Sequence, residues 1–509
     1  MNLFHRQFAV SSALAALLLT GCRVGPKYSV PAATATAPPT TYKEAPAATP
    51  AQTSTDTGEW HPAAPQDAML RGKWWEIYGD PELNTLEDQL NINNQNVKQY
   101  FENFMAARTL VAQARAQLYP AVSFGPSYTR SRSSSNLGTS GTANPGKESS
   151  VGSLPITATW EPDLWGKIRN TINEEQYNAQ LSAADLENER LTEQASLATF
   201  FFEIRGQDAL IDILNKTIVA DQKSLDYAQA QYDTGVGDKI SVVEAQNTLQ
   251  NVQASATNLG VARAQYEHAI AMLTGVNPSG FSIAAKPLLR TAPPIPLGVP
   301  SQLLERRPDI AASERTMASA NAQIGIAYAA FYPDLTLSAS GGFESSTFKH
   351  LFDWPSRVWS IGPSISQPIY DAGLRRAEVN QYIATYNADV AGYRQTVLTA
   401  FQQVEDNLAA VRILAQQMQQ QAAAEKSAEE YVELETARYQ TGIDPYVDLV
   451  LAQTTLLTDQ QTLATLHVQQ MTASVQLIEA LGGGWDRTQL PTPAQVSQKL
   501  TKTDTTIQQ

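Results

Sequence analysis

The 509-residue sequence predicts a mainly α-helical chain that has a transmembrane β part and is internally duplicated. Three observations indicate this fold class. Long stretches without proline are rich in residues that favour helix. A 19-residue segment recurs in the second half of the chain without a gap. Short segments of alternating apolar and polar residues have the pattern of membrane strands. Each half is therefore expected to contain a helix, two strands, a long helix, a tight turn and a further helix.

Proline positions separate a tether from the helices. Residues 24–66 contain eight of the 28 prolines, set among Ala, Thr and Ser. This composition cannot bury enough apolar surface to order itself, so residues 22–66 are expected to form an extended tether. Proline is absent from 163–277, where a helix from about Lys167 to Asp233 would be about 100 Å long at 1.5 Å per residue. An ordinary globular domain does not need a helix of that length.

Apolar residues recur every seven positions in the segment after this long helix. One seam contains Val242, Leu249 and Ala256, and its companion contains Ala245 and Val252. Repeated heptads of this kind indicate coiled-coil packing. Separate short core helices would need breaking residues that the sequence does not supply.

The chain repeats itself at an offset of 207 positions. Residues 231–249 (QYDTGVGDKISVVEAQNTL) align without a gap with residues 438–456 (RYQTGIDPYVDLVLAQTTL). So long a period indicates a duplicated domain and not a short-repeat solenoid. The predicted organisation is a first repeat at 67–285, a second repeat at 286–490 and a flexible C-terminal tail at 491–509.

Two strands are expected in each repeat, at about 118–163 and about 333–369. Apolar residues such as Val122, Phe124 and Ile156 alternate with small or polar ones over about ten residues, as in strands with lipid on one face and water on the other. Four strands are too few to close into a membrane barrel, and a bilayer tolerates no open sheet edge. Two chains would make an eight-stranded barrel filled by side chains, whereas three would make a twelve-stranded barrel with room for a channel. We therefore expect a homotrimer.

The N-terminus predicts an export signal with a lipid attachment site. Residues 1–21 have the charged start and short apolar run of a signal peptide. The segment Leu19-Thr20-Gly21-Cys22 resembles a bacterial lipobox, in which the Cys becomes acylated and anchors the chain. The alternative is a buried free Cys22 after an ordinary signal peptide. Arg23 stands where an Asp often retains such lipoproteins at the inner membrane, which favours the outer membrane.

Composition excludes several other functions. The net charge of −14 argues against nucleic-acid binding. One Cys and five scattered His argue against a metal site, so no cofactor is expected apart from the covalent lipid. The sequence has no GxSxG motif and no P-loop, so we do not expect an enzyme. No apolar run beyond residue 21 is long enough for a transmembrane helix.

With these features established, the chain resembles the TolC-like outer-membrane efflux factors. The similarity is greatest to the lipoprotein branch that serves resistance-nodulation-division pumps. Four segments carry it: 22–28 (CRVGPKY), 74–83 (WWEIYGDPEL), 160–166 (WEPDLWG) and 298–310 (GVPSQLLERRPDI). In the last segment, Pro308 would also open a helix with Asp309 favourable at its positive end.

The resemblance implies a lipid-anchored outer-membrane trimer that extends into the periplasm. Its twelve-stranded barrel would continue into an α-helical coiled-coil barrel. The helix tips would dock on a periplasmic adaptor joined to an inner-membrane pump, and the channel would pass drugs or other small toxic compounds. Metal-ion export and type I protein secretion are the alternatives, and a coiled-coil scaffold without a pore is disfavoured by the strands. Seven Met without a cluster favour organic substrates over soft metals.

The resemblance also places a gate at the periplasmic helix tips. The turns that would dock on the adaptor are Thr234-Gly235 and Thr441-Gly442. The residues carried over as the gate are Tyr439, Asp444, Val447, Asp448 and Leu451, with Tyr232, Ser241 and Glu244 from the first repeat. A structural interpretation remains open, in which Tyr439 and Leu451 are coiled-coil core and Asp444 belongs to a turn and cap.

Overall fold

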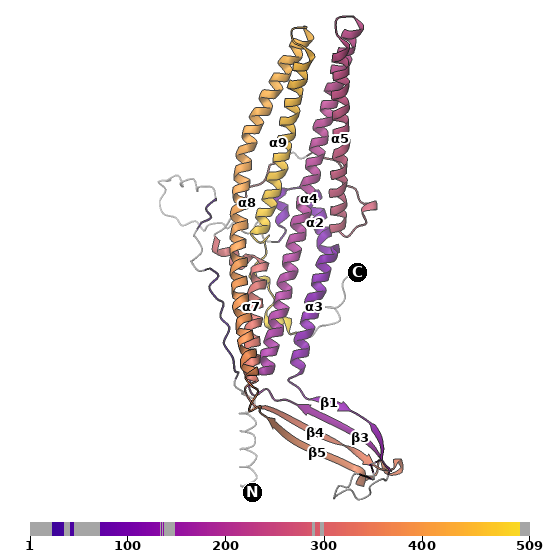
Figure 1. Cartoon of the computed structure of the whole chain (residues 1–509), viewed down its shortest axis with the longest axis vertical. Helices are drawn as coiled ribbons and strands as arrows, with labels where there is room; N and C mark the ends of the chain where they lie inside the picture. Colours follow the sequence, from indigo (N-terminus) through magenta and orange to yellow (C-terminus); the bar gives the residue numbers. More distant parts are fainter. Residues whose placement is uncertain are drawn as a thin grey trace.

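The computed structural model describes residues 23–34, 41–44, 72–132, 134, 136, 148–287, 291–295 and 300–498. The predicted signal peptide and Cys22 lie outside these residues. The described chain is elongated, with a bundle of long helices running along it and one β-sheet at one end (Figure 1). Among the described residues, no helix combines the length and the apolar character needed to cross a membrane.

Two pairs of helices dominate the structure. The first half contains α4 (Lys167–Asp233, 67 residues) and α5 (Lys239–Leu273, 35 residues). The second half contains α8 (Leu374–Gln440, 67 residues) and α9 (Tyr446–Ala480, 35 residues). Corresponding helices start and end 207 positions apart, so the sequence repeat is also a structural repeat. The helix predicted from Lys167 to Asp233 is confirmed.

Shorter helices complete each half on the side of the sheet. These are α3 (Gln95–Ala116) and α7 (Pro308–Ala329), each of 22 residues. Helix α4 contacts α5 toward the tips and α3 toward the sheet, while α8 contacts α9 and α7 in the same way (Figure 1). Helix α7 begins at Pro308 as predicted, because proline suits a first helical position. Contacts of α4 with both α7 and α9 join the two halves.

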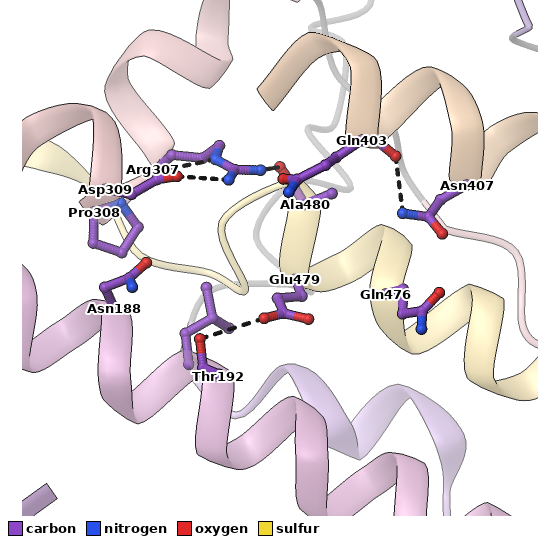
Figure 2. A pocket seen from close by; sticks show the side chains of 11 residues that line it. Asn188, Thr192, Arg307, Pro308, Asp309, Gln403, Asn407, Gln476, Glu479 and Ala480 are labelled. Atoms are coloured by element: carbon purple, nitrogen blue, oxygen red, sulfur yellow. Dashed lines mark hydrogen bonds and ion pairs between the residues drawn. The ribbon is translucent and has the colours of Figure 1, made fainter. Parts of the chain in front are cut away.

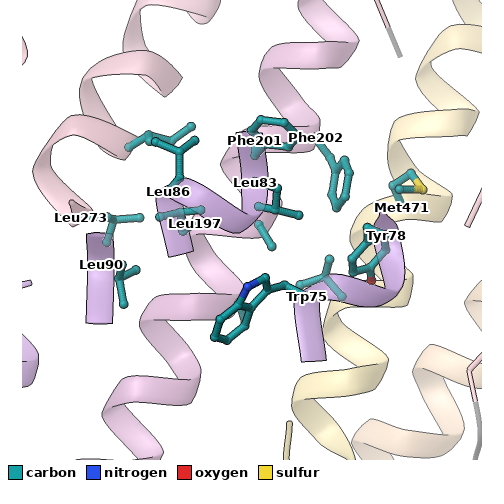
Figure 3. Close-up of a cluster of buried hydrophobic side chains, with 14 of the residues drawn as sticks. Trp75, Tyr78, Leu83, Leu86, Leu90, Leu197, Phe201, Phe202, Leu273 and Met471 are labelled. Carbon is teal, nitrogen blue, oxygen red and sulfur yellow. The ribbon is translucent and has the colours of Figure 1, made fainter. Parts of the chain in front are cut away.

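The largest apolar core among the described residues lies around α2, midway along the long helices (Figure 1), and Figure 3 shows its side chains from close by. It is formed where η2 (Trp74–Tyr78) and α2 (Pro81–Asn93) pack on α4 and α9. Its buried members include Trp74, Leu83, Leu90, Phe201, Phe202 and Met471. Asp80 caps α2 by accepting hydrogen bonds from the amides of Glu82 and Leu83. The remaining short helices are α6 (Leu303–Arg306) and α10 (Pro493–Val496).

The sheet joins strands from both halves of the chain. Its strands are β1 (Ala121–Phe124), β2 (Ser127–Arg132), β3 (Glu148–Trp160), β4 (Asp334–Ser345) and β5 (Arg357–Ser366). All pairings are antiparallel, and β3 pairs with β4 from the other half, with Ala158 opposite Ala339. The prediction of four strands needs one correction. The first strand is divided into β1 and β2, which both pair with β3, because Pro126 cannot donate a ladder hydrogen bond.

The outer strands of the sheet expose large apolar side chains. Every residue of β1, β2 and β5 is exposed. Trp359 and Ile361 are 75% and 76% exposed, and Val122 is 68% exposed. One edge of the sheet, β1 with β2, and the opposite edge, β5, have no neighbouring strand among the described residues.

The described parts of the predicted tether are docked on the helices, so the expectation of an unordered segment is wrong for 23–34 and 41–44. Arg23 donates a hydrogen bond to Asn170, and the Val24 amide donates to the Trp165 carbonyl at 3.1 Å. The hydroxyl of Tyr28 donates to the Glu314 carboxylate. Tyr42 is buried against α8 and α9, and this burial raises its pKa to about 12. Anchoring side chains at intervals compensate for the poor apolar content of the segment.

The predicted C-terminal tail is also ordered where the structure describes it. Helix α10 packs on α3 and α4 through Val496, which is buried with Val111 and Ala179. The side chain of Gln180 donates to the Pro491 carbonyl at 2.8 Å. Residues 491–498 therefore do not form a flexible tail, because one buried apolar side chain and a capped helical turn hold them in place.

Candidate functional site at the helix tips

The two helical hairpins end in turns of the same design. In the first hairpin, Thr234 donates to the Ala230 carbonyl and Gly235 adopts a left-handed conformation, with φ of 81°. In the second hairpin, Thr441 donates to the Ala437 carbonyl and Gly442 has φ of 73°. Glycine adopts this conformation without steric cost, and the threonine hydroxyl satisfies a carbonyl at the helix end. The predicted turns thus lie at the two exposed tips (Figure 1).

A buried group of side chains joins the two hairpins just below the turns. We call it the tip cluster, and it consists of Ala228, Val242, Ala245, Tyr439, Tyr446 and Leu449. The Tyr439 hydroxyl donates to the Gln231 side chain of the first hairpin at 3.1 Å. The Tyr227 hydroxyl donates in the opposite direction, to the Gln440 carbonyl at 2.9 Å. These two hydrogen bonds link the two hairpins beside their turns.

Aromatic rings surround Tyr439 on both sides. Its ring centroid lies 5.5 Å from that of Tyr227 and 5.4 Å from that of Tyr446. Burial raises the pKa of the Tyr439 hydroxyl, which therefore stays protonated and able to donate. The sequence analysis singled out Tyr439 but missed Tyr227, Tyr446 and Gln231. Tyr446 lies in the first turn of a helix with a heptad pattern, and this position could have predicted that its ring packs at the tip.

Asp444 is paired within its own hairpin. Its carboxylate forms an ion pair with Arg438, which donates from Nη2 to Oδ1 at 2.9 Å. The hydrogen bond from the Arg438 guanidinium holds the pKa of Asp444 below its usual value. The pair closes the turn between α8 and α9, in agreement with the structural interpretation of Asp444.

The other predicted gate residues of the second repeat lie on the outside of the tip cluster. Val447 and Leu451 are 57% and 59% exposed, and Asp448 is half-buried between them in the first turns of α9. One helical turn brings positions 447, 448 and 451 to one side of the helix. Leu449 and Ala452 occupy the buried side. This side of the helix therefore carries two exposed apolar side chains and one half-buried carboxylate.

The counterparts in the first repeat have a different environment. Tyr232 is exposed and its ring lies 5.2 Å from the Lys239 ammonium. Ser241 is half-buried, and its amide donates to Asp238, the residue that caps α5. Glu244 is exposed in the following turn. The structure thus places all eight predicted gate residues at the tips, but of these only Tyr439 belongs to the tip cluster.

A buried carboxyl group lies beneath the tip cluster. Asp221 in α4 is 2% exposed, and its Oδ2 has no hydrogen-bond partner in the described part of the chain. Burial raises the pKa of Asp221 to about 6. Burial raises the pKa of Tyr446 in the other hairpin, and the Asp221 carboxyl group adds to this rise. The sequence analysis missed Asp221 because an acidic residue in a long helix is normally expected to be exposed to solvent.

Nothing in the described part of the chain resembles a metal centre, since no group of three His, Cys, Asp or Glu side chains converges there. The tips instead combine a buried aromatic joint with an exposed face of mixed apolar and acidic character. Such an arrangement can hold two hairpins together and present a surface to other chains.

Comparison with known proteins identifies the class. A family model described as outer membrane efflux protein matches residues 86–276 and 299–483. The toluene efflux pump outer membrane protein TtgC of Pseudomonas putida is 31% identical over 481 residues, covering 94% of this chain and 95% of that protein. The outer membrane protein OprJ of Pseudomonas aeruginosa is 30% identical, covering 94% and 96%.

Solved structures agree with this result. The outer-membrane channel OprN is similar with a TM-score of 0.80 and 26% identity, covering 91% of this chain and all of that one. The CmeC outer membrane channel of Campylobacter jejuni has a TM-score of 0.80 and 20% identity, and it supports the fold alone. The chain belongs to the outer membrane efflux protein family. The family resemblance found in the sequence is confirmed.

Proposed function

We propose that three copies of this chain form an outer-membrane efflux channel. The channel would pass drugs or other small toxic compounds from an inner-membrane pump and a periplasmic adaptor to the outside. The observation that carries this proposal is a sheet with exposed apolar side chains and two open edges among the described residues, built directly onto hairpins of long helices. The names of similar proteins, which include components of toluene and antibiotic efflux pumps, support organic cargo.

The sheet explains why one copy is not enough. Unpaired strand edges cannot remain in a bilayer, so β5 of one copy must pair with the β1–β2 edge of another. Strands β1 and β2 lie end to end along β3, so together they occupy one strand position. With β3, β4 and β5, each copy supplies four strand positions. Three copies then close a twelve-stranded barrel that is wide enough for a channel. The apolar side chains of β1 and β5 would face lipid.

The position of the N-terminal segment supports a lipid anchor on Cys22. Arg23 lies next to Gly166 at the junction of the sheet and α4, and the Val24 amide is bonded to Trp165. Cys22 is joined directly to Arg23, so an acyl group on it would start beside the strand ends. An anchor there would place the sheet in the outer membrane and the helices in the periplasm.

The most direct test is the oligomeric state and pore activity of the detergent-extracted protein. We expect a trimer in size-exclusion chromatography with light scattering, and discrete ion channels after insertion in planar bilayers. A monomer that remains soluble without detergent would contradict the proposal. Deletion of the gene in its host should raise sensitivity to organic toxic compounds. Sensitivity to metal ions alone would instead support metal export.

Asp448 provides a test of the gate. Three symmetry-related carboxylates near the axis would attract cations and narrow the entrance. We expect Asp448→Ala to raise single-channel conductance and to lower the preference for cations, because the ring of charge is removed. Reversal potentials in a salt gradient measure the selectivity. Glu76→Ala, which removes an exposed acid of η2 far from the tip, serves as the control. Equal conductance and selectivity in wild type and Asp448→Ala would remove Asp448 from the gate.

A further inference from the structure

A cavity of about 440 Å³ lies in the middle of the helical body, where the C-terminal end of α9 meets the N-terminal end of α7 (Figure 2). Its volume is within the range of small-molecule sites in proteins. Four helices contribute to its walls. The lining side chains used below are Asn188 and Thr192 of α4, Asn407 of α8, Gln476 and Glu479 of α9, and Arg307 before α7.

The cavity lies on the side of α9 that faces away from η2. Ser474 of α9 marks the side toward η2, because its hydroxyl lies 2.8 Å from the Tyr78 hydroxyl. At about 100° per residue, Gln476 and Glu479 lie roughly 200° and 140° around the helix from Ser474. In the proposed trimer η2 and α2 must be outside, since they would otherwise fill the tunnel. The cavity therefore opens toward the tunnel.

Around the cavity, the described residues leave one carboxylate without a cation of its own. Arg307 is paired with Asp309 by two hydrogen bonds, of 2.7 and 3.0 Å, and also donates to the Ala480 carbonyl at 2.9 Å. Glu479 accepts a hydrogen bond from the Thr192 hydroxyl at 3.4 Å, which is long (Figure 2). Partial burial raises the pKa of Glu479 and Arg307 opposes this rise. The amide side chains of Asn188 and Gln476 add neutral acceptors.

We propose that this cavity is a transit site for organic cations, in which Glu479 pairs with the positive charge and the amide oxygens accept hydrogen bonds from amino groups elsewhere on the cargo. The inference rests on the proposed channel function and names a class of cargo for it. An organic cation fits better than a metal ion, because no three ligating side chains converge among the described residues and the cavity is much larger than an ion. One unmatched carboxylate gives the weak binding that allows cargo to leave again.

The test uses the full-length trimer in detergent and ethidium as the cationic probe, with binding measured by fluorescence anisotropy. We expect Glu479→Gln to weaken ethidium binding about tenfold, the effect of losing one charged hydrogen-bond partner. Glu102→Gln, which changes an exposed acid of α3, should bind like wild type. Asn407→Arg keeps the carboxylate but places a cation beside it in the cavity, and should weaken binding as well.

The outcomes separate this inference from the function on which it rests. A wild-type protein that forms no trimer and no channels overturns the proposed function. A wild-type protein that forms channels but does not bind ethidium overturns the transit site alone. Equal binding by wild type and Glu479→Gln, with both trimeric and equally heat-stable, also overturns it. Weaker binding by both Glu479→Gln and Asn407→Arg, but not by Glu102→Gln, supports the site.

Discussion

An Asp208→Ala variant is expected to lose about 3–5 kcal/mol of stability, the usual cost of removing one partner of a buried ion pair. Asp208 is buried in α4, where its Oδ1 accepts from Arg263 at 2.7 Å. Its Oδ2 accepts from the Lys286 amide at 2.9 Å and from Arg205 at 3.4 Å. Removal of the carboxylate leaves the buried guanidinium of Arg205 and the half-buried guanidinium of Arg263 with fewer partners. The free energy of unfolding should fall because the Arg205 charge stays buried.

Circular dichroism of the purified protein during denaturation measures this loss. Asp212→Ala is the matched control, since Asp212 lies one turn further along α4 in an exposed ion pair with Lys216. Exposed pairs contribute at most about 1 kcal/mol, so the control should unfold nearly like wild type. Equal losses in the two variants would show that the network of Asp208, Arg205 and Arg263 does not stabilise the helical body.

The second large effect concerns pH. The pKa of Asp221 is about 6 in the packed tip, whereas the ordinary value for Asp is 3.8. The packed state therefore binds the proton more tightly than an opened tip does, and the packing is favoured when Asp221 is protonated. As pH rises from about 4 to 6, this advantage is lost. The equilibrium between packed and opened tips should shift toward opening by tenfold to a hundredfold, on the order expected for this pKa difference.

Hydrogen exchange of the α4 and α9 amides near the tip, corrected for intrinsic rates, measures the shift. Asp221→Asn keeps the shape but cannot ionise, so its protection should depend little on pH. Asp226→Asn, an exposed residue of the same helix, should retain the wild-type dependence. Protection that is independent of pH in wild type would show that Asp221 does not control the packing of the tip.

The prediction from sequence succeeded where local pattern sets structure. The helix from Lys167 to Asp233 followed from the absence of proline, and the repeat placed its partner 207 positions later. The strands followed from alternation along the chain. The break at Pro126 was missed, although a proline within a strand was a usable signal. The docking of residues 23–34 and 41–44 was missed because composition describes a segment alone, without the partners Asn170, Glu314 and Arg412.

At the candidate site, the sequence placed the turns and the eight predicted gate residues at the helix tips. It could not show that Tyr439 reaches Gln231 or that Asp444 is held by Arg438. It also could not reveal the buried carboxyl of Asp221 or the cavity beside Glu479.

Periodicity, proline positions and duplication therefore determined the elements of this protein and their order, because these depend on neighbours a few residues apart. Only the tertiary structure decided which polar groups are buried, paired or left without a partner. Those properties depend on contacts between residues as far apart as Gln231 and Tyr439, and such contacts leave no local trace in the chain.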